Sequence, residues 1–251
     1  MEQEEYRKHF ELERDHWWFQ GMRAAYGVLL QRAIPRNQQA ETLQVLNLGC
    51  GAGETSRWLQ QFGHVTSIDA AWDALAWAGK RALSNRVQGL AEQLPFRSHT
   101  FDLIAGLGLI EHIETDDVAL REMARVCRPG GLLLLLTSAH QFLWSHHDRA
   151  NHHCRRYTAG QLRKLMVGAA WEPFCVSYVN MFLFPVIVTI RVAQRATGWD
   201  VRQTSSDLAM PHPWLNAICR CLLYAEALWL RHGTLPFGVS LVCLAKRASD
   251  A

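Results

Sequence analysis

An apolar, strand-like run from Val45 to Leu48 stops at three alternating glycines, Gly49, Gly51 and Gly53, and a helical pattern follows them. A glycine-rich turn between a strand and a helix lets the backbone approach a ligand closely and directs amide groups at it. The turn therefore predicts an α/β fold with a ligand at the carboxyl end of an early strand. Several chemistries use such a turn, so the turn alone does not identify the ligand.

Strand-like and helical runs alternate after this turn. Further strand-like runs occur at 65–69, 101–107, 130–138, 171–179 and 239–245. Helical patterns separate the early runs, which is typical of βαβ units and a mostly parallel sheet. The unbroken apolar run from Leu132 to Leu136 predicts a central strand that is buried on both faces. A helix is expected to begin at Thr158, and about fifty residues of helical sequence precede the last strand.

Composition limits the partners and the compartment. The 251 residues, of which 49% are hydrophobic, suit a single α/β domain. The formal net charge is only +3 and the basic residues form no long tract, so we expect no nucleic-acid partner. Seven cysteines without a Cys-x-x-Cys pair, and a charged start without the apolar core of a signal peptide, favour a cytoplasmic protein with reduced thiols.

The spacing of the glycines bears on the ligand. A dinucleotide fingerprint places a third glycine where this chain has Glu54, and a carboxylate there would oppose an incoming pyrophosphate. S-adenosylmethionine has no phosphate and needs an acceptor for its ribose hydroxyls. Asp69 ends the next predicted strand about twenty residues on, where a carboxylate can accept from both hydroxyls. These features favour S-adenosylmethionine over NAD(P), and an ordinary tight turn with an exposed aspartate is the structural alternative.

Four stretches in this order resemble the class I S-adenosylmethionine-dependent methyltransferases, and most closely the type 11 branch that includes the ubiquinone and menaquinone methyltransferases. They are "LNLGCGAG", "SIDAAWDAL", "AEQLPFRSHTFDLI" and "LGLIEHIETDDVALREMARVCRPGGLLLLLT". The resemblance implies a Rossmann-like, seven-stranded, mostly parallel sheet with the last strand antiparallel and helices on both faces. It also implies a list of cofactor-binding residues: Gly49, Cys50, Gly51 and Gly53 at the methionine part, Asp69 and Ala70 at the ribose, Ala91 and Glu92 near the adenine, and Leu107 after the fourth strand. Relatives often have an acidic residue before Ala91, where this chain has Leu90.

The start of the chain carries a second resemblance. "DHWWFQGMR", Asp15 to Arg23, is similar to an N-terminal His-Trp-Trp-Phe motif of many bacterial methyltransferases of this class, often associated with polysaccharide or secondary-metabolite pathways. The resemblance implies a cap over the cofactor. Trp17 would shield the cofactor cation and Arg23 would reach its carboxylate. A helix that packs its two tryptophans on the sheet is the alternative.

Three histidines are candidate bases near the transferred methyl group. His112 follows the fourth strand, and its ordinary pKa lies near working pH; a helix-start residue that orients the loop is the alternative. The segment "LWSHHDRANHHCRRYT" resembles a loop that faces the acceptor in the same bacterial branch, which implies catalytic roles for His147 and His153. It implies acceptor binding by Asp148, Arg156 and Tyr157. A solvated, charge-paired loop is the plain alternative, and the spacing of the histidines suits no metal ion, so none is predicted.

Four segments are expected within the single domain at 1–251: a helical N-terminal cap at 1–40, a cofactor-binding core at 41–180, a helical insertion or lid at 181–235, and a final strand and tail at 236–251. The insertion has more apolar surface than one sheet edge needs, which favours a lid over a hydrophobic acceptor, a homodimer surface or a peripheral membrane contact, although core packing also explains such faces. Its longest apolar run, Met181 to Ile190, is too short to cross a bilayer. Nearby arginines favour an anionic or lipid-linked acceptor: Arg191, Arg195, Arg220 and Arg231.

We therefore predict an S-adenosylmethionine-dependent methyltransferase acting on a small-molecule, lipid-like or glycan-pathway acceptor. Transfer to oxygen is slightly favoured over transfer to carbon or nitrogen. Catalysis would be mainly positional, since the sulfonium is already activated. A cofactor-binding protein that has lost turnover and a nicotinamide-dependent oxidoreductase are the alternatives.

Overall fold

The computed structural model describes residues 3–34, 43–197 and 209–249. Parts of the predicted cap (1–2 and 35–40), of the predicted insertion (198–208) and of the tail (250–251) lie outside the described residues, as do 41–42.

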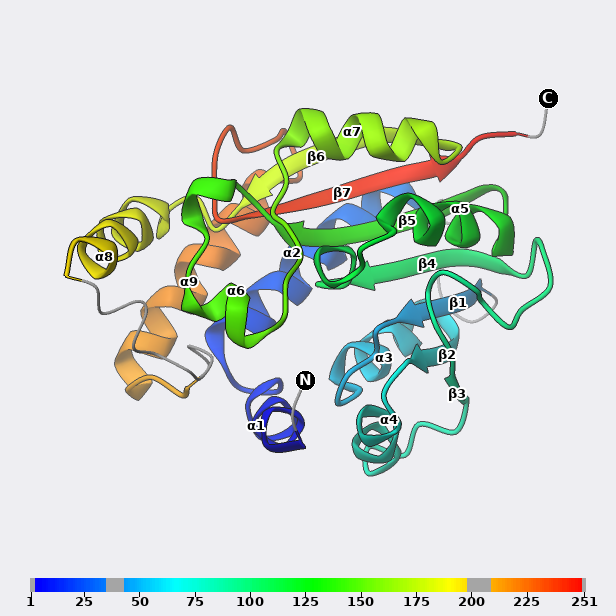
Figure 1. Ribbon diagram of the computed structural model, residues 1–251, viewed down its shortest axis with the longest axis horizontal. Helices are drawn as coiled ribbons and strands as arrows, with labels where there is room; N and C mark the ends of the chain where they lie inside the picture. Colours follow the sequence, from blue (N-terminus) through cyan, green and yellow to red (C-terminus); the bar gives the residue numbers. More distant parts are fainter. Residues whose placement is uncertain (1–2, 35–42, 198–208, 250–251) are drawn as a thin grey trace.

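A seven-stranded sheet forms the centre of the protein, with the strand order β3-β2-β1-β4-β5-β7-β6 (Figure 1). The strands are β1 (Leu43–Leu48), β2 (Gly63–Asp69), β3 (Arg86–Gln88), β4 (Phe101–Leu107), β5 (Cys127–Ser138), β6 (Trp171–Val179) and β7 (Ser240–Arg247). β7 runs antiparallel to both of its neighbours, β5 and β6, and the pairings among β1 to β5 are parallel. The predicted Rossmann-like sheet with an antiparallel last strand is confirmed.

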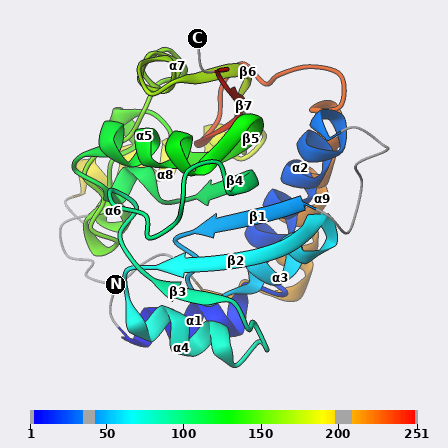
Figure 2. The same cartoon turned by 90° about the vertical axis from the view of Figure 1, so that its right-hand side faces the viewer.

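Helices cover both faces of this sheet (Figure 2). The described helices are α1 (Gln3–Leu12), α2 (Trp17–Ala33), α3 (Glu54–Leu59), α4 (Trp72–Gly79), α5 (Asp116–Val126), α6 (His146–Ala150), α7 (Ala159–Gly168), α8 (Phe184–Ala196) and α9 (Pro213–Trp229), with short 3₁₀ turns η2 (Gln60–Phe62), η3 (Ile110–His112) and η4 (Gln141–Leu143). α5 and α7 pack in the core on one face, and α2, α3 and α9 pack in the core on the other. α7 begins after Thr158 as predicted, because Thr158 and Gln161 form a capping box.

The continuous leucine run lies in β5, in the middle of the sheet. Leu133 and Leu135 point into the core beneath α5 and α7, whereas Leu132, Leu134 and Leu136 point into the core beneath α2 and α9. Because successive side chains of a strand alternate between faces, a strand buried on both faces needs apolar residues at every position. This explains why the run shows no alternation.

The late helix α9 packs along the N-terminal helix α2, so two segments far apart in the sequence lie side by side (Figures 1 and 2). Asn216 of α9 accepts a hydrogen bond from the Trp17 backbone N–H at 2.8 Å and donates one to the Asp15 carbonyl at 3.0 Å. Arg220 donates to the Gln20 side chain at 3.1 Å. The predicted cap and the predicted insertion therefore pack against each other through α2 and α9.

The sheet has a switch point between β1 and β4. From β1 the chain proceeds to β2 and β3 on one side, and from β4 it proceeds to β5 on the other. In open α/β sheets ligands bind outside the carboxyl ends of the strands at such a point. Gly49 follows β1 and Gly108 follows β4, both with positive φ.

Candidate active site

Two cavities adjoin at the switch point. The Asp69 cavity, of about 660 Å³, lies beside the ends of β1 and β2, and the histidine cavity, of about 280 Å³, lies between β4, β5, α1, α2 and α6. The two cavities share part of their wall. The residues that line both are Tyr6, Gly49, Gly51, Gly108, His112 and Asn151. A ligand that fills one cavity therefore reaches the edge of the other.

The glycine turn has the backbone conformation that its residues predicted. Gly49 and Gly51 have φ angles of 66° and 52°, in the left-handed region that favours glycine, and both line the cavities. Gly53 lines neither cavity. A Cβ atom there would come within 3.0 Å of Ala78 in α4, so Gly53 instead allows the helices to pack closely. Cys50 lines the histidine cavity, and burial raises the pKa of its thiol.

Asp69 is held so that its carboxylate faces the cavity named after it. One carboxylate oxygen accepts a hydrogen bond from the Gly51 backbone N–H at 3.0 Å, and the other accepts one from the Ala71 N–H at 3.0 Å. Each oxygen has further capacity to accept, which suits a neighbouring pair of hydroxyl groups. Three more of the predicted residues line the Asp69 cavity: Ala70, Ala91 and Glu92. Leu107 lines the histidine cavity. The structure therefore brings these predicted residues together around the switch point.

The first turn of α3 differs from the sequence-based expectation. Glu54 forms an ion pair with Arg81 at 2.7 Å, and both side chains are largely buried. The carboxylate that meets the amino end of α3 belongs to Glu13, which accepts from the Glu54 backbone N–H at 3.3 Å. Glu13 therefore adds a second carboxylate beside Glu54 at this helix end, and a carboxylate there opposes the binding of a pyrophosphate.

The His-Trp-Trp-Phe motif starts α2, and its members have different roles. His16 caps the helix by accepting from the Trp18 backbone N–H at 3.2 Å. Trp18 and Phe19 line the histidine cavity, whereas Trp17 lines neither cavity and its backbone is fastened to Asn216. The structure thus places Trp18 at the cavity wall, whereas Trp17 lies outside both cavities. The contact of Trp17 with the cofactor stays a prediction.

Arg23 lines the histidine cavity, and its guanidinium is also part of the turn between α1 and α2. It donates to the Glu13 carbonyl at 2.8 Å and to the Arg14 carbonyl at 3.1 Å. Burial lowers the pKa of Arg23, and the nearby carboxylates of Glu54 and Glu13 oppose that effect. Arg23 thus fixes the cap on the core and leaves a positive charge at the cavity wall.

The three predicted histidines come together in the histidine cavity. The rings of His112 and His153 meet edge to face with centroids 4.5 Å apart, and those of His147 and His153 lie 6.0 Å apart. Burial lowers the pKa of His112, while Glu111 raises it and His153 lowers it further. At neutral pH His112 is therefore an uncharged imidazole in the wall that both cavities share.

His153 differs from the other two because a buried carboxylate holds it. Its Nδ1 lies 2.9 Å from Asp148, whose side chain is fully buried. Although burial acts to raise the pKa of Asp148, hydrogen bonds from His153 and Arg156 hold it well below its ordinary value. Since an ionised carboxylate only accepts, Nδ1 of His153 carries the proton of this hydrogen bond, so a neutral ring held in this way has its accepting nitrogen at Nε2.

The structure does not place the three residues predicted to bind the acceptor in the lining of the two cavities: Asp148, Arg156 and Tyr157. Arg156 donates to both oxygens of Asp148 at 2.7 and 2.9 Å, and both side chains are buried. Tyr157 donates to Asp116 at 2.6 Å beneath η3. A buried charge requires a partner, so these side chains pair inside the protein and support the loop from behind.

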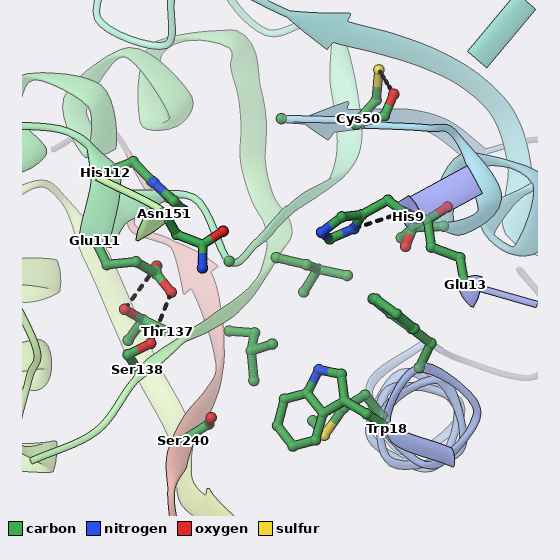
Figure 3. A pocket seen from close by; sticks show the side chains of 18 of the residues that line it. His9, Glu13, Trp18, Cys50, Glu111, His112, Thr137, Ser138, Asn151 and Ser240 are labelled. Carbon is green, nitrogen blue, oxygen red and sulfur yellow. Dashed lines mark hydrogen bonds and ion pairs between the residues drawn. The ribbon is translucent and has the colours of Figure 1, made fainter. Parts of the chain in front are cut away.

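Sequence reasoning missed several side chains of the histidine cavity (Figure 3). Glu111 is buried and accepts hydrogen bonds from Thr137 at 2.9 Å and from Ser138 at 3.3 Å, on the side opposite His9 and Glu13. Glu111 stands next to His112 in the sequence, which was a usable signal. Glu13 offered none, because it directly follows a strongly charged helical stretch that is typical of a solvated surface.

Comparisons with known proteins agree with this geometry. Residues 46–135 match the family Methyltransf_11, described as a methyltransferase domain. The chain is 34% identical over 99 residues to malonyl-[acyl-carrier protein] O-methyltransferase of Pectobacterium atrosepticum, covering 39% of this chain and 39% of that protein. It is 33% identical over 104 residues to ubiquinone biosynthesis O-methyltransferase of Maricaulis maris, covering 39% and 41%. Residues 46–135 are therefore similar to a methyltransferase domain, and these comparisons support the resemblance to the class I S-adenosylmethionine-dependent methyltransferases.

A solved methyltransferase has the same fold. Phosphoethanolamine N-methyltransferase 2 of Haemonchus contortus, in complex with S-adenosyl-L-methionine, superposes with a TM-score of 0.57 at 16% identity. The superposition covers 90% of this chain and 52% of that one. The chain spans only about two fifths of the length of the two curated relatives named above. The predicted motif at the start of the chain lies outside the residues that match the methyltransferase family.

S-adenosylmethionine is the cofactor of this methyltransferase domain, and the residues present suit it. Asp69 offers two accepting oxygens beside the glycine turn. The wall toward the histidine cavity contains the carboxylates of Glu13 and Glu111 and the aromatic rings of Trp18 and Tyr26. Carboxylates and aromatic faces both stabilise a cation, which suits a sulfonium and an ammonium group.

Proposed function

We propose that the chain transfers the methyl group of S-adenosylmethionine to a hydroxyl group of a small or lipid-like acceptor held in the histidine cavity. The observation that carries the proposal is the shared wall of the two cavities. Asp69 lies in one cavity and the Asp148-held His153 in the other, with Gly49, Gly108 and His112 between them.

The lining of the histidine cavity supports an acceptor with an apolar body and a polar reacting end. Its lining includes apolar side chains, among them Trp18, Met22 and Leu136. It also includes polar ones, among them Glu111, His112 and His153. A pocket of this kind takes up an apolar ligand and orients it by a few polar contacts.

His153 is the base that this arrangement favours. S-adenosylmethionine supplies a methyl group on a positively charged sulfur, so the bond that breaks is already activated. Nε2 of His153 accepts the proton that the acceptor hydroxyl loses as its oxygen bonds to the methyl carbon. Asp148 acts as a positioning residue, because it holds the tautomer in which Nε2 is unprotonated and stabilises the ring once it is charged. The chain otherwise contributes alignment of the two reactants.

Labelled cofactor tests the proposal. The purified protein is incubated with S-adenosylmethionine labelled in its methyl group and with an extract of the producing cell, and label is measured in extracted small molecules and lipids. We expect labelled product from the wild type and a rate lower by about a hundredfold or more for His153→Gln, which is the usual contribution of a general base. The affinity of His153→Gln for S-adenosylhomocysteine should stay unchanged.

His147→Gln is the matched variant, since His147 lines the same cavity but lacks the bond to Asp148. We expect a smaller loss from it. If His147→Gln loses transfer and His153→Gln does not, the base is misassigned. If the wild type binds S-adenosylhomocysteine and yields no labelled product, the chain is a cofactor-binding protein without turnover. Undiminished transfer by both variants would indicate a carbon or nitrogen acceptor that needs no base.

A further inference from the structure

α8 is an exposed helix with an apolar composition. None of its residues, Phe184 to Ala196, is buried, although a helix of a globular protein ordinarily buries one face. Val186 and Val192 are 55% and 60% exposed, and Ile190 is 47% exposed. The exposed surface of α8 is therefore apolar over a large part of its length.

α9 presents a second apolar surface, which we call the outer stripe of α9. It consists of Trp214, Ile218, Cys221, Ala225, Leu228 and Trp229, which are all exposed and recur at helical spacing on one face. Trp214 and Trp229, near the two ends of the helix, are 59% and 62% exposed. The opposite face of α9 packs on α2. The outer stripe contains no charged residue.

Within the described parts of the two helical segments themselves, the charges outside the core are positive. Four arginines occur in the described residues 181–197 and 209–235: Arg191, Arg195, Arg220 and Arg231. The single acidic residue of those two ranges, Glu226, is buried and accepts from the backbone N–H groups of Asn180 and Phe182. Within the described part of the chain, Arg195 donates to the backbone carbonyl groups of Phe142 and Trp144, which are uncharged and so do not neutralise its charge.

We propose that the exposed face of α8 and the outer stripe of α9 rest on an anionic lipid bilayer, with α9 lying in the plane of the surface. Exposed apolar side chains with terminal tryptophans and neighbouring arginines are the features that place a helix at the boundary between lipid headgroups and acyl chains. No helix in the described part of the chain is long and apolar enough to cross a bilayer, so the contact is peripheral. A symmetric dimer through the same face would bring the arginines of two copies together, which disfavours that occupant.

The position of this surface relative to the site agrees with the proposal. The carboxyl ends of the parallel strands, where the cavities lie, point toward the side of the molecule that carries α8 and α9 (Figure 1). α9 packs on α2, whose Trp18 and Met22 line the histidine cavity. A bilayer at this surface would hold the cavity near lipid-soluble molecules. The inference itself does not depend on methyl transfer.

Vesicle flotation with the full-length protein tests the inference. The probes are vesicles of phosphatidylcholine mixed with phosphatidylglycerol, and vesicles of phosphatidylcholine alone. We expect the protein to float with the anionic vesicles, to bind the neutral ones less, and to be released from the anionic ones in part as salt rises, because surface charges are then screened. The partition coefficient of the Trp214→Glu/Ile218→Glu double variant on the anionic vesicles should be lower than that of the wild type by a factor of about ten or more.

Val167→Glu is the matched control, since Val167 is 61% exposed on α7, away from α8 and α9. It should float as the wild type does, and unchanged melting temperatures confirm that both variants fold. Failure of the wild type to float with anionic vesicles overturns the inference. So does equal flotation of the double variant and the control. The surface would instead bind a second copy of the chain if the wild type does not float but forms a dimer in ultracentrifugation, and if the double variant is a monomer.

Discussion

The charge state of His112 links the stability of the protein to pH. Burial lowers the pKa of this imidazole below the ordinary value of 6.5, against the opposing effect of Glu111. Below that pH the unfolded chain takes up a proton that the folded protein binds less readily. The contribution of His112 to the free energy of unfolding should therefore be complete above pH 6.5 and decrease as the pH falls through that value.

Urea unfolding of the wild type and His112→Asn at about pH 7.5 and about pH 5.5 measures this contribution. We expect the wild type to lose more stability than the variant between the two values. His16 and His140, whose pKa values burial also lowers, are present in both proteins and cancel in the comparison. Equal losses in the two proteins would show that His112 titrates normally.

At the scale of single residues the sequence indicated the right segments but not the directions of their side chains. The loop that contains His153 and Asp148 was predicted to face the acceptor, and His153 lines the cavity. Asp148 points inward because Arg156, eight residues later, provides a buried partner for its charge. Which member of such a pair faces the ligand depends on how the loop folds, and no periodicity encodes it.

At the scale of elements, the packing of α2 on α9 depends on a missing side chain. A Cβ atom at Gly21 would come within 2.4 Å of Leu223, which is buried in α9. We expect Gly21→Ala to lower the free energy of unfolding by about 1–3 kcal/mol through overpacking, although alanine favours helix more than glycine does. Gly27→Ala in the same helix is the control, since a Cβ atom there would meet only Trp58, at 3.6 Å.

Chemical denaturation of both variants measures the difference. Gly27→Ala should be neutral or stabilising by up to about 1 kcal/mol, because only its helix propensity changes. A Gly21→Ala variant as stable as Gly27→Ala would mean that α2 and α9 separate without cost, and that the cap is not fixed to the insertion.

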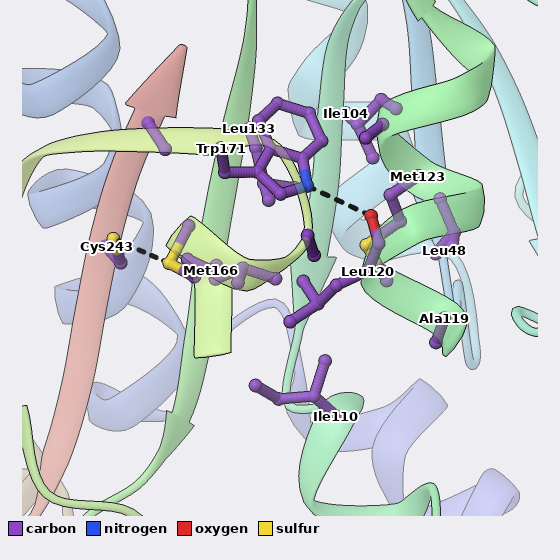
Figure 4. Close-up of a cluster of buried hydrophobic side chains, with 14 of the residues drawn as sticks. Leu48, Ile104, Ile110, Ala119, Leu120, Met123, Leu133, Met166, Trp171 and Cys243 are labelled. Atoms are coloured by element: carbon purple, nitrogen blue, oxygen red, sulfur yellow. Dashed lines mark hydrogen bonds between the residues drawn. The ribbon is translucent and has the colours of Figure 1, made fainter. Parts of the chain in front are cut away.

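Elements with a strong pattern were predictable from the sequence, and short or supporting ones were not. β6 occupies the predicted residues 171–179, because alternation marks a long strand. The three-residue β3 was missed, since both of its ends are exposed and polar. Trp171 was assigned only to a strand, but its indole is buried and donates to the Leu120 carbonyl of α5 at 3.0 Å (Figure 4). That contact joins residues fifty-one positions apart, which a local pattern cannot show.

At the scale of the whole molecule, the sheet could be predicted from the alternation of strands and helices together with the family resemblance. The packing of the cap helices could not. α2 comes before the first strand and α9 comes before the last, yet the two helices pack on each other, and residues of α1 and α2 line the histidine cavity. Several amphipathic helices compete for the same apolar surface, so periodicity alone does not pair them. The sequence located a methyltransferase core, and the structure adds the side chains of the cap that face its ligand.

The central claim is that the glycine turn and Asp69 hold S-adenosylmethionine rather than a dinucleotide, and titration calorimetry with S-adenosylhomocysteine and with NAD tests it most directly. We predict that S-adenosylhomocysteine binds at one site and that NAD gives no binding heat. The Asp69→Ala variant should bind S-adenosylhomocysteine about tenfold to a hundredfold more weakly, because it loses hydrogen bonds from the ribose to a charged acceptor. Binding of NAD without binding of S-adenosylhomocysteine, or an Asp69→Ala variant with wild-type affinity, would contradict the account.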